Sequence, residues 1–262
     1  MKVTVGYDFE HDAPKTVPVP GFGGAHWLVG GSSGAGKTRL LHAVIAQLAP
    51  DPTTAIVASD PAMMDLKPWA PRLSALALGR LGAPWLLERL EAEFDARLRA
   101  GNEADADVLP VTVDMPRIVA VFDELAMVTM GGGKDVVPRL IDLANVGRKV
   151  NIGLLLATQS PKATVVPMMV REQCAVRICL RTREPEQTDA ILGTQRIPAH
   201  RIPAGHKGRA YVDDSENDVC QVRAPFIDNQ QIRQRASDTA HLTPDLGEGW
   251  VRVWDQYKER AA

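Results

Sequence analysis

The run Gly31–Thr38, which reads GSSGAGKT, constrains this chain of 262 residues more than any other feature. It fits the pattern G-x-x-x-x-G-K-[ST] in full. Gly31, Gly34 and Gly36 allow successive backbone N–H groups to turn inward around phosphate oxygens. A short apolar run precedes the loop and a helical pattern follows it, so the positive end of that helix would point at the anion. The loop therefore predicts an α/β fold that binds a nucleotide.

The loop pattern also predicts roles for two of its residues, Lys37 and Thr38. Lys37 would place a point charge near the β- and γ-phosphates of ATP, and the hydroxyl of Thr38 would bind Mg²⁺. ATP and Mg²⁺ are therefore the expected substrate and cofactor. The expected nucleotide contacts are the loop and the residue that follows it, namely Gly31, Ser32, Ser33, Gly34, Ala35, Gly36, Lys37, Thr38 and Arg39.

Two later apolar runs end in polar residues. The run 118–122 is followed by Asp123, a second expected Mg²⁺ ligand, and by Glu124, which would polarise the attacking water. The run 154–157 is followed by Thr158 and Gln159, which could contact the γ-phosphate or that water. Capping of the strand end is the alternative for each residue. Together with the loop, these strand ends predict a RecA-like P-loop ATPase of the additional-strand, catalytic-Glu type.

Apolar runs alternate with helical periods along the chain, which favours a largely parallel sheet with helices on both faces. The expected strands are 26–29, 55–59, 118–122, 152–157 and 176–180, with a hairpin formed by 208–213 and 219–223. The expected helices are 37–48, 84–100, 136–146 and 185–192, the second ending at Gly101.

Both ends of the chain are expected to lie outside the main domain. Residues 1–24 read as a strand and a strap, and residues 237–262 as a tail. In the tail, Trp250, Trp254 and Tyr257 are spaced like one stripe of a helix. Docking of this stripe within the chain is favoured over contact with another subunit or with a membrane surface.

Composition excludes several classes of protein. With 30 Lys and Arg against 32 Asp and Glu, the chain cannot be a uniformly basic nucleic-acid coat, although a local basic patch is allowed. No apolar stretch reaches membrane-spanning length and no secretory peptide is present, so a cytoplasmic location is expected. Cys174, Cys179 and Cys220 have no metal-binding spacing and read as buried free thiols.

Several stretches resemble the motor domain of the FtsK/SpoIIIE family of double-stranded DNA translocases. They span roughly residues 24–225 and include HWLVGGSSGAGKTRLLHAVIAQL, PRIVAVFDELAMV and LANVGRKVNIGLLLATQSP. The resemblance implies that residues 25–236 form an ATP-driven motor that moves double-stranded DNA as a homo-oligomeric ring, expected to be a hexamer. Small single-domain forms belong to conjugative elements, plasmids or phages, so transfer of a mobile element is implied. Among catalytic residues beside Lys37 and Glu124, Arg148 would be a trans-acting arginine finger and Gln159 a sensor.

The resemblance also raises expectations about DNA and partners. Lys134, Arg139 and Lys162 would face a central channel and contact phosphates, with solvated surface charge as the alternative for each. Ala62 replaces the Lys of the family's D-P-K motif. The family's membrane anchor and DNA-reading winged helix are not found in the chain, so a loading or membrane-recruiting partner protein is expected. Two alternative functions stay open: a type VII secretion-like protein-export ATPase, and a non-translocating, ATP-dependent adaptor bound to DNA.

Overall fold

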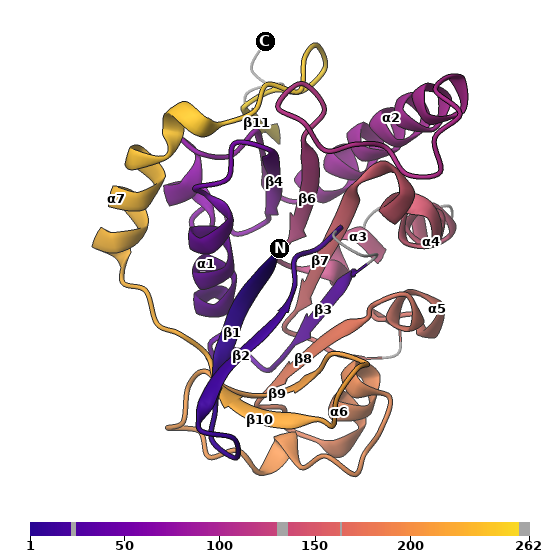
Figure 1. Cartoon of the computed structure of the whole chain (residues 1–262). Helices are drawn as coiled ribbons and strands as arrows, with labels where there is room; N and C mark the ends of the chain where they lie inside the picture. Colours follow the sequence, from indigo (N-terminus) through magenta and orange to yellow (C-terminus); the bar gives the residue numbers. More distant parts are fainter. Residues whose placement is uncertain (22–24, 130–135, 163, 257–262) are drawn as a thin grey trace.

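The computed structural model describes residues 1–21, 25–129, 136–162 and 164–256 (Figure 1). These residues form one eleven-stranded sheet in the order β11-β5-β4-β6-β7-β3-β8-β9-β10-β1-β2. The strands are β1 (Lys2–Asp8), β2 (Ala13–Pro18), β3 (Trp27–Gly30), β4 (Thr54–Asp60), β5 (Ala75–Leu78), β6 (Arg117–Phe122), β7 (Ile152–Thr158), β8 (Val176–Leu180), β9 (Arg209–Asp213), β10 (Cys220–Arg223) and β11 (Val253–Asp255).

The helices flank this sheet. They are α1 (Lys37–Leu48), α2 (Gly82–Glu103), α3 (Leu125–Thr129), α4 (Val136–Val146), α5 (Met168–Glu172), α6 (Pro185–Leu192) and α7 (Asn229–Asp238), with short 3₁₀ turns that include η1 (Lys67–Trp69) and η2 (Gly147–Val150). No helix in the described part of the chain is long and apolar enough to cross a membrane.

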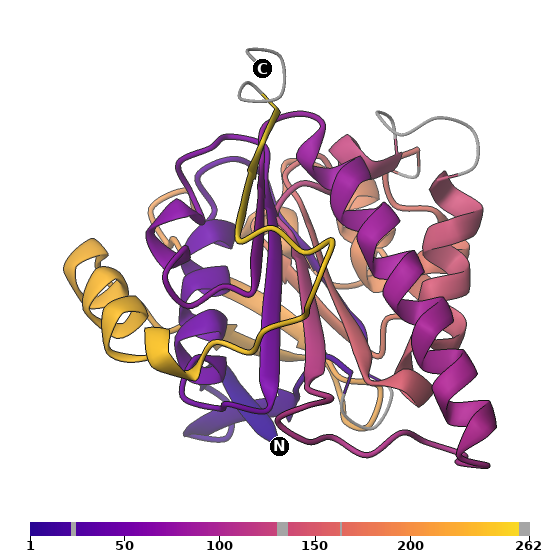
Figure 2. The same ribbon diagram turned by 90° about the horizontal axis from the view of Figure 1, so that it is seen from above.

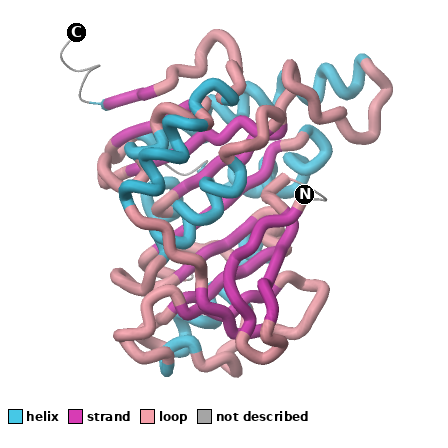
Figure 3. Tube along the Cα trace, turned by 60° about the vertical axis from the view of Figure 1, so that its left-hand side comes forward, coloured by secondary structure: helices cyan, strands magenta, loops and turns pink. Residues whose placement is uncertain are grey.

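The sheet is parallel from β11 to β8 and antiparallel from β8 to β2. Figure 3 shows the antiparallel strands together at one end and the C-terminal strand at the other. The predicted fold class, a largely parallel sheet with helices on both faces, is confirmed (Figure 2). The sheet places β7 between β3 and β6, so the strand that ends in Asp123 is not a direct neighbour of the strand before the phosphate loop.

Strand β6 explains why the central strands are continuously apolar. Val119 and Val121 face one core with α1 and α7, whereas Ile118, Ala120 and Phe122 face the other core with α2 and α4. Figure 2 shows α1 and α7 on one side of the sheet and α2 on the other. Because both faces are covered, both alternating sets of side chains must be apolar.

Three sequence expectations are corrected by the structure. Helix α2 continues through Gly101 to Glu103, and the backbone reaches a left-handed conformation only at Asp105, whose φ is 50°. The strand expected near the N-terminus is β1, and β2, in the segment expected as a strap, pairs with it as a hairpin. No strand is expected over residues 75–78, where the structure has β5.

The tail also differs from the expected helix. Residues Val253–Asp255 form β11, which pairs in parallel with β5 at the edge of the sheet. Trp254 is buried and its ring stacks on Trp85 of α2, with centroids 5.6 Å apart. Backbone groups along β5 would otherwise lack partners, and pairing with them decides the conformation of the tail. Docking within the chain is thus correct for Trp254, and Tyr257 lies outside the described residues.

Candidate nucleotide site

The phosphate loop lies between β3 and α1, as its sequence predicts. Gly36 adopts a φ of 109°, which side chains disfavour. A Cβ atom at Gly36 would also lie 2.8 Å from the backbone nitrogen of Gly208. That same N–H donates a 2.8 Å hydrogen bond to the carbonyl oxygen of Ala35. The glycine is therefore required both by its conformation and by the close packing of the loop against residues 205–208.

Lys37 and Asp123 meet at the carboxyl end of the sheet. Both are buried, and the Lys37 ammonium donates to the Asp123 carboxylate at 2.5 Å and to the backbone oxygen of the same residue. The structure thus brings together the two charged groups that the sequence assigns to phosphate and Mg²⁺. In the absence of bound phosphates, Lys37 and Asp123 neutralise each other's charge.

Glu124 is held by the end of β7. Its Oε1 accepts a 2.7 Å hydrogen bond from the Thr158 hydroxyl, and its Oε2 accepts one of 2.9 Å from the backbone N–H of Gln159. Thr158 thus contacts Glu124, whereas the exposed Gln159 side chain lines the space beside the phosphate loop. This arrangement fixes the carboxylate expected to act on water.

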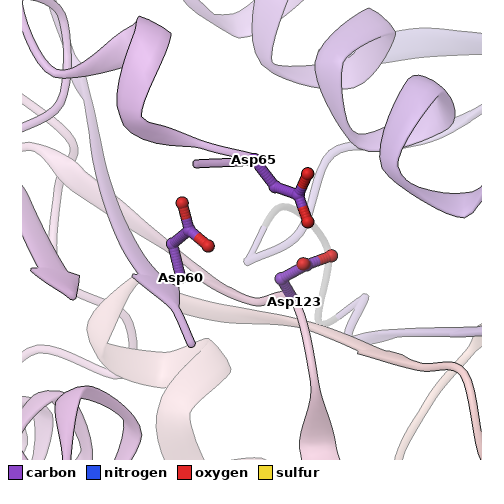
Figure 4. A group of neighbouring side chains, drawn as sticks. All are labelled: Asp60, Asp65 and Asp123. Carbon is purple, nitrogen blue, oxygen red and sulfur yellow. The ribbon is translucent and has the colours of Figure 1, made fainter. Parts of the chain in front are cut away.

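Asp60 and Asp65 join Asp123 in a cluster that the sequence analysis missed (Figure 4). One carboxylate oxygen from each lies within 4.8 Å of the others. Burial raises the pKa of both Asp60 and Asp65, and the charge of Asp123 adds to this. Oxygen donors of this kind suit Mg²⁺, so the residues present fit that ion. The signal was available in DPAMMD, where Asp60 ends β4 and Asp65 follows five residues later.

A pocket of about 580 Å³ opens from the phosphate loop. Its other wall comes from the ends of β9 and β10 and includes Lys207, Arg223 and Phe226. The guanidinium of Arg39 lies 5.4 Å from the centre of the exposed Phe226 ring and donates to the backbone oxygen of Ile227 at 3.1 Å. Sequence reasoning missed this wall because no motif connects it with the loop, and only the fold brings the two together.

The remaining expected site residues lie elsewhere. Arg148 is exposed in η2, at the end of β7 opposite the phosphate loop. Arg139 of α4 forms an ion pair with Glu91 of α2, so its charge is partly neutralised. Lys162 is exposed in the segment after β7. Lys134 lies outside the described residues.

The chain resembles DNA translocases in sequence. It is 24% identical to DNA translocase FtsK of Staphylococcus aureus over 278 residues, which covers 94% of this chain and 34% of that protein. It is 23% identical to FtsK of Leptospira interrogans, with 80% and 24% covered. The chain therefore spans about a third or less of the length of these curated relatives. No family model matches it.

Solved structures share the fold. The monomer form of the pCW3 conjugation coupling protein TcpA with ATPγS has a TM-score of 0.76 at 21% identity, covering 92% of this chain and 70% of that one. The cytoplasmic domain of the type VII secretion ATPase EccC from Thermomonospora curvata has a TM-score of 0.77 at 17% identity, covering 95% and 32%. EccC ATPases 2 and 3 in complex with a signal sequence peptide reach 0.78 at 14% identity, covering 95% and 49%.

These likenesses agree with the site geometry. The phosphate loop, the paired Lys37 and Asp123, and the fixed Glu124 lie together at one end of the parallel strands, where α/β folds bind their ligands. The resemblance that the motifs indicate is confirmed: the chain is similar in sequence to the FtsK DNA translocases and shares the fold of the TcpA and EccC structures.

Proposed function

We propose that this chain hydrolyses ATP and couples the reaction to movement of double-stranded DNA, as a ring of identical subunits. The observation that carries the proposal is the complete nucleotide site on a chain whose sequence relatives are named DNA translocases. Transfer of a mobile element is the proposed context, since a conjugation coupling protein shares the fold. We assign residues 25–236 to the motor, residues 1–24 to an N-terminal segment and residues 237–262 to a tail. Strands β1 and β2 of the first segment and β11 of the tail join the sheet of the motor.

The proposed mechanism begins with exchange of partners at Lys37. Its ammonium leaves the Asp123 carboxylate and binds the β- and γ-phosphates, while backbone N–H groups of the loop surround the phosphate oxygens. Thr38 and Asp123 would hold Mg²⁺, which supplies charge neutralisation on the phosphates. Glu124, held by Thr158 and Gln159, orients the attacking water and accepts its proton.

The second wall of the pocket offers a partner for the base of the nucleotide. The exposed ring of Phe226 offers a stacking surface for a purine, and Arg39 holds that ring through its contacts with Phe226 and Ile227. Arg148 lies at the opposite edge of the sheet, so it would act in the site of a neighbouring subunit. A ring places such a residue and a phosphate loop on facing surfaces.

The direct test is ATP hydrolysis by the purified chain with duplex DNA, with single-stranded DNA and without DNA. We expect strong stimulation by duplex DNA and slower turnover otherwise. Binding to DNA without any turnover would contradict the motor and favour the adaptor.

Protein export is a second candidate, because the EccC structures share this fold as closely as TcpA does. One of them is in complex with a signal sequence peptide. The same hydrolysis assay separates the two functions. An export ATPase would respond to a peptide and show no stimulation by either form of DNA.

A further inference from the structure

A second, smaller pocket adjoins the catalytic carboxylates. It has a volume of about 250 Å³ and is lined by Pro61, Ala62, Asp65, Arg80, Asp123, Glu124, Met127 and Gln159. Arg80 is the one cation among these lining residues. Gln159 lines both this pocket and the pocket of the phosphate loop, so the two spaces meet at the end of β7. Arg80 therefore lies on the far side of the reaction centre from the loop.

The turn that carries Arg80 is fixed from several directions. Gly79 has a φ of 82°, and its N–H donates to the backbone oxygen of Asp60 at 3.1 Å. The N–H of Leu81 donates to Oε1 of Gln256 at 3.1 Å, so the segment after β11 also holds the turn. A Cβ atom at Gly79 would lie 2.4 Å from Nε2 of Gln256, and a glycine is needed there. The backbone of Arg80 is thus positioned by β4 and by the tail.

The side chain of Arg80 has no such partner. It is exposed, and within the described ranges it forms neither an ion pair nor a hydrogen bond, although carboxylates line the same pocket. Asp123 is neutralised by Lys37, and Glu124 accepts from Thr158 and Gln159. An unpaired guanidinium matches the geometry of a phosphate group, which it can bind through two parallel hydrogen bonds.

We propose that Arg80 binds the terminal phosphate of the ATP molecule held by its own subunit. The proposal rests on the proposed ATPase function and adds a cation from the turn after β5 to the residues that recognise the substrate. ADP lacks the phosphate that Arg80 contacts. The contact therefore lets the site distinguish ATP from ADP, and it differs from that of Arg148, which would come from a neighbouring subunit.

The test compares the affinity of the full chain for ATPγS and for ADP by calorimetry, with Mg²⁺ and without DNA. We expect Arg80→Ala to weaken binding of ATPγS about tenfold or more, as loss of a charge-assisted hydrogen bond implies, and to leave binding of ADP unchanged. Arg99→Ala removes an exposed arginine from α2 that lines neither pocket, and it should change neither affinity. Lys37→Ala should weaken both.

A rescue variant separates phosphate binding from general damage. Ala62 is exposed and lines the same pocket, so Ala62→Lys places a new cation there. In the Arg80→Ala background it should restore part of the affinity for ATPγS. The proposal is overturned if Arg80→Ala weakens ATPγS and ADP equally, or weakens neither. If Arg80→Ala shows the expected loss of affinity for ATPγS but the wild-type chain does not hydrolyse ATP, the proposed function is refuted and the contact of Arg80 with the phosphate stands.

Discussion

Glu124 has donors on both carboxylate oxygens, and this makes its chemistry testable without damage to the fold. In Glu124→Gln the amide oxygen can still accept from the N–H of Gln159, and the hydroxyl of Thr158 can turn to accept from the new NH₂ group, so only the longer 3.3 Å bond from the N–H of Ala126 is lost. The charge that orients and deprotonates water is lost. We expect ATP hydrolysis to fall about 10²–10⁴-fold while nucleotide still binds.

The measurement is steady-state phosphate release alongside nucleotide binding. Glu88→Gln makes the same change at an exposed position on α2 and should leave both unchanged. Turnover near the wild-type rate in Glu124→Gln would remove Glu124 from the proposed mechanism.

We expect His42 to lower the stability of the folded protein in acid. It is buried in α1, and its Nδ1 accepts a 3.0 Å hydrogen bond from Nε1 of Trp69. Burial lowers its pKa from 6.5 to about 4. Below pH 6.5 the unfolded chain therefore binds a proton that the folded chain refuses, so stability falls as the pH drops towards 4. Between pH 7 and pH 5, His42 alone should lower the free energy of unfolding by about 2 kcal/mol.

Urea unfolding at a series of pH values checks this expectation. His42→Gln keeps an acceptor for Trp69 but cannot titrate, so its stability should depend less steeply on pH. His26 has a pKa lowered by burial to about 4 as well, and some pH dependence will remain. His241→Gln at an exposed site should behave as wild type; an unchanged slope in His42→Gln would show that His42 is not responsible.

At the scale of elements, β11 is a short strand at the sheet edge, and Trp254 anchors it. Its ring stacks on Trp85, and its residues pair with Leu76–Leu78 of β5. Trp254→Ala removes this packing, worth about 3 kcal/mol for a buried tryptophan. Because β11 has only three residues, we expect the tail to detach rather than the whole domain to unfold.

Hydrogen exchange can observe this detachment. The N–H of Leu76, which donates to the backbone oxygen of Arg252, should exchange faster in Trp254→Ala while amides in β6 stay protected. Trp250→Ala changes a half-buried ring outside β11 and serves as the control. Equal loss of protection in β5 and β6 would show that β11 is part of the global fold instead.

At the scale of the whole molecule, the sheet separates Arg148 from the phosphate loop of its own chain. Strand β7 spans seven residues between them, which corresponds to about 20 Å at 3.3 Å per residue. The proposed ring therefore makes a specific prediction for mixed subunits. Arg148→Ala should bind ATP but hydrolyse it poorly, because an arginine finger contributes about 10³–10⁵ to the rate in related enzymes.

Mixing Arg148→Ala with Lys37→Ala should restore part of the hydrolysis. Some interfaces in a mixed ring would combine an intact phosphate loop with an intact Arg148, which neither variant can form alone. Native mass spectrometry must show that mixed rings exist. Mixed rings whose activity is only the sum of the separate variants would contradict action in trans.

The sequence by itself determined the local features of this protein. The spacing of Gly31, Gly34, Gly36 and Lys37 specified the loop, because phosphate binding depends on consecutive backbone groups. Helix α1 and strand β8 begin and end at the residues expected from hydrophobic period, since those patterns are local. The strand ends at Asp123 and Gln159 were also readable, because chemistry at the carboxyl edge follows directly after an apolar run.

Tertiary structure decided which distant segments meet. Three residues of tail became a strand because β5 offered unpaired backbone groups, although the spacing of the tail's aromatic residues favoured a helix. The clustering of Asp60 and Asp65 with Asp123, the wall containing Phe226, and the place of Arg80 all depend on the order of strands in the sheet. Strand order is set by packing across the whole chain, and a linear pattern of residues carries no direct record of it.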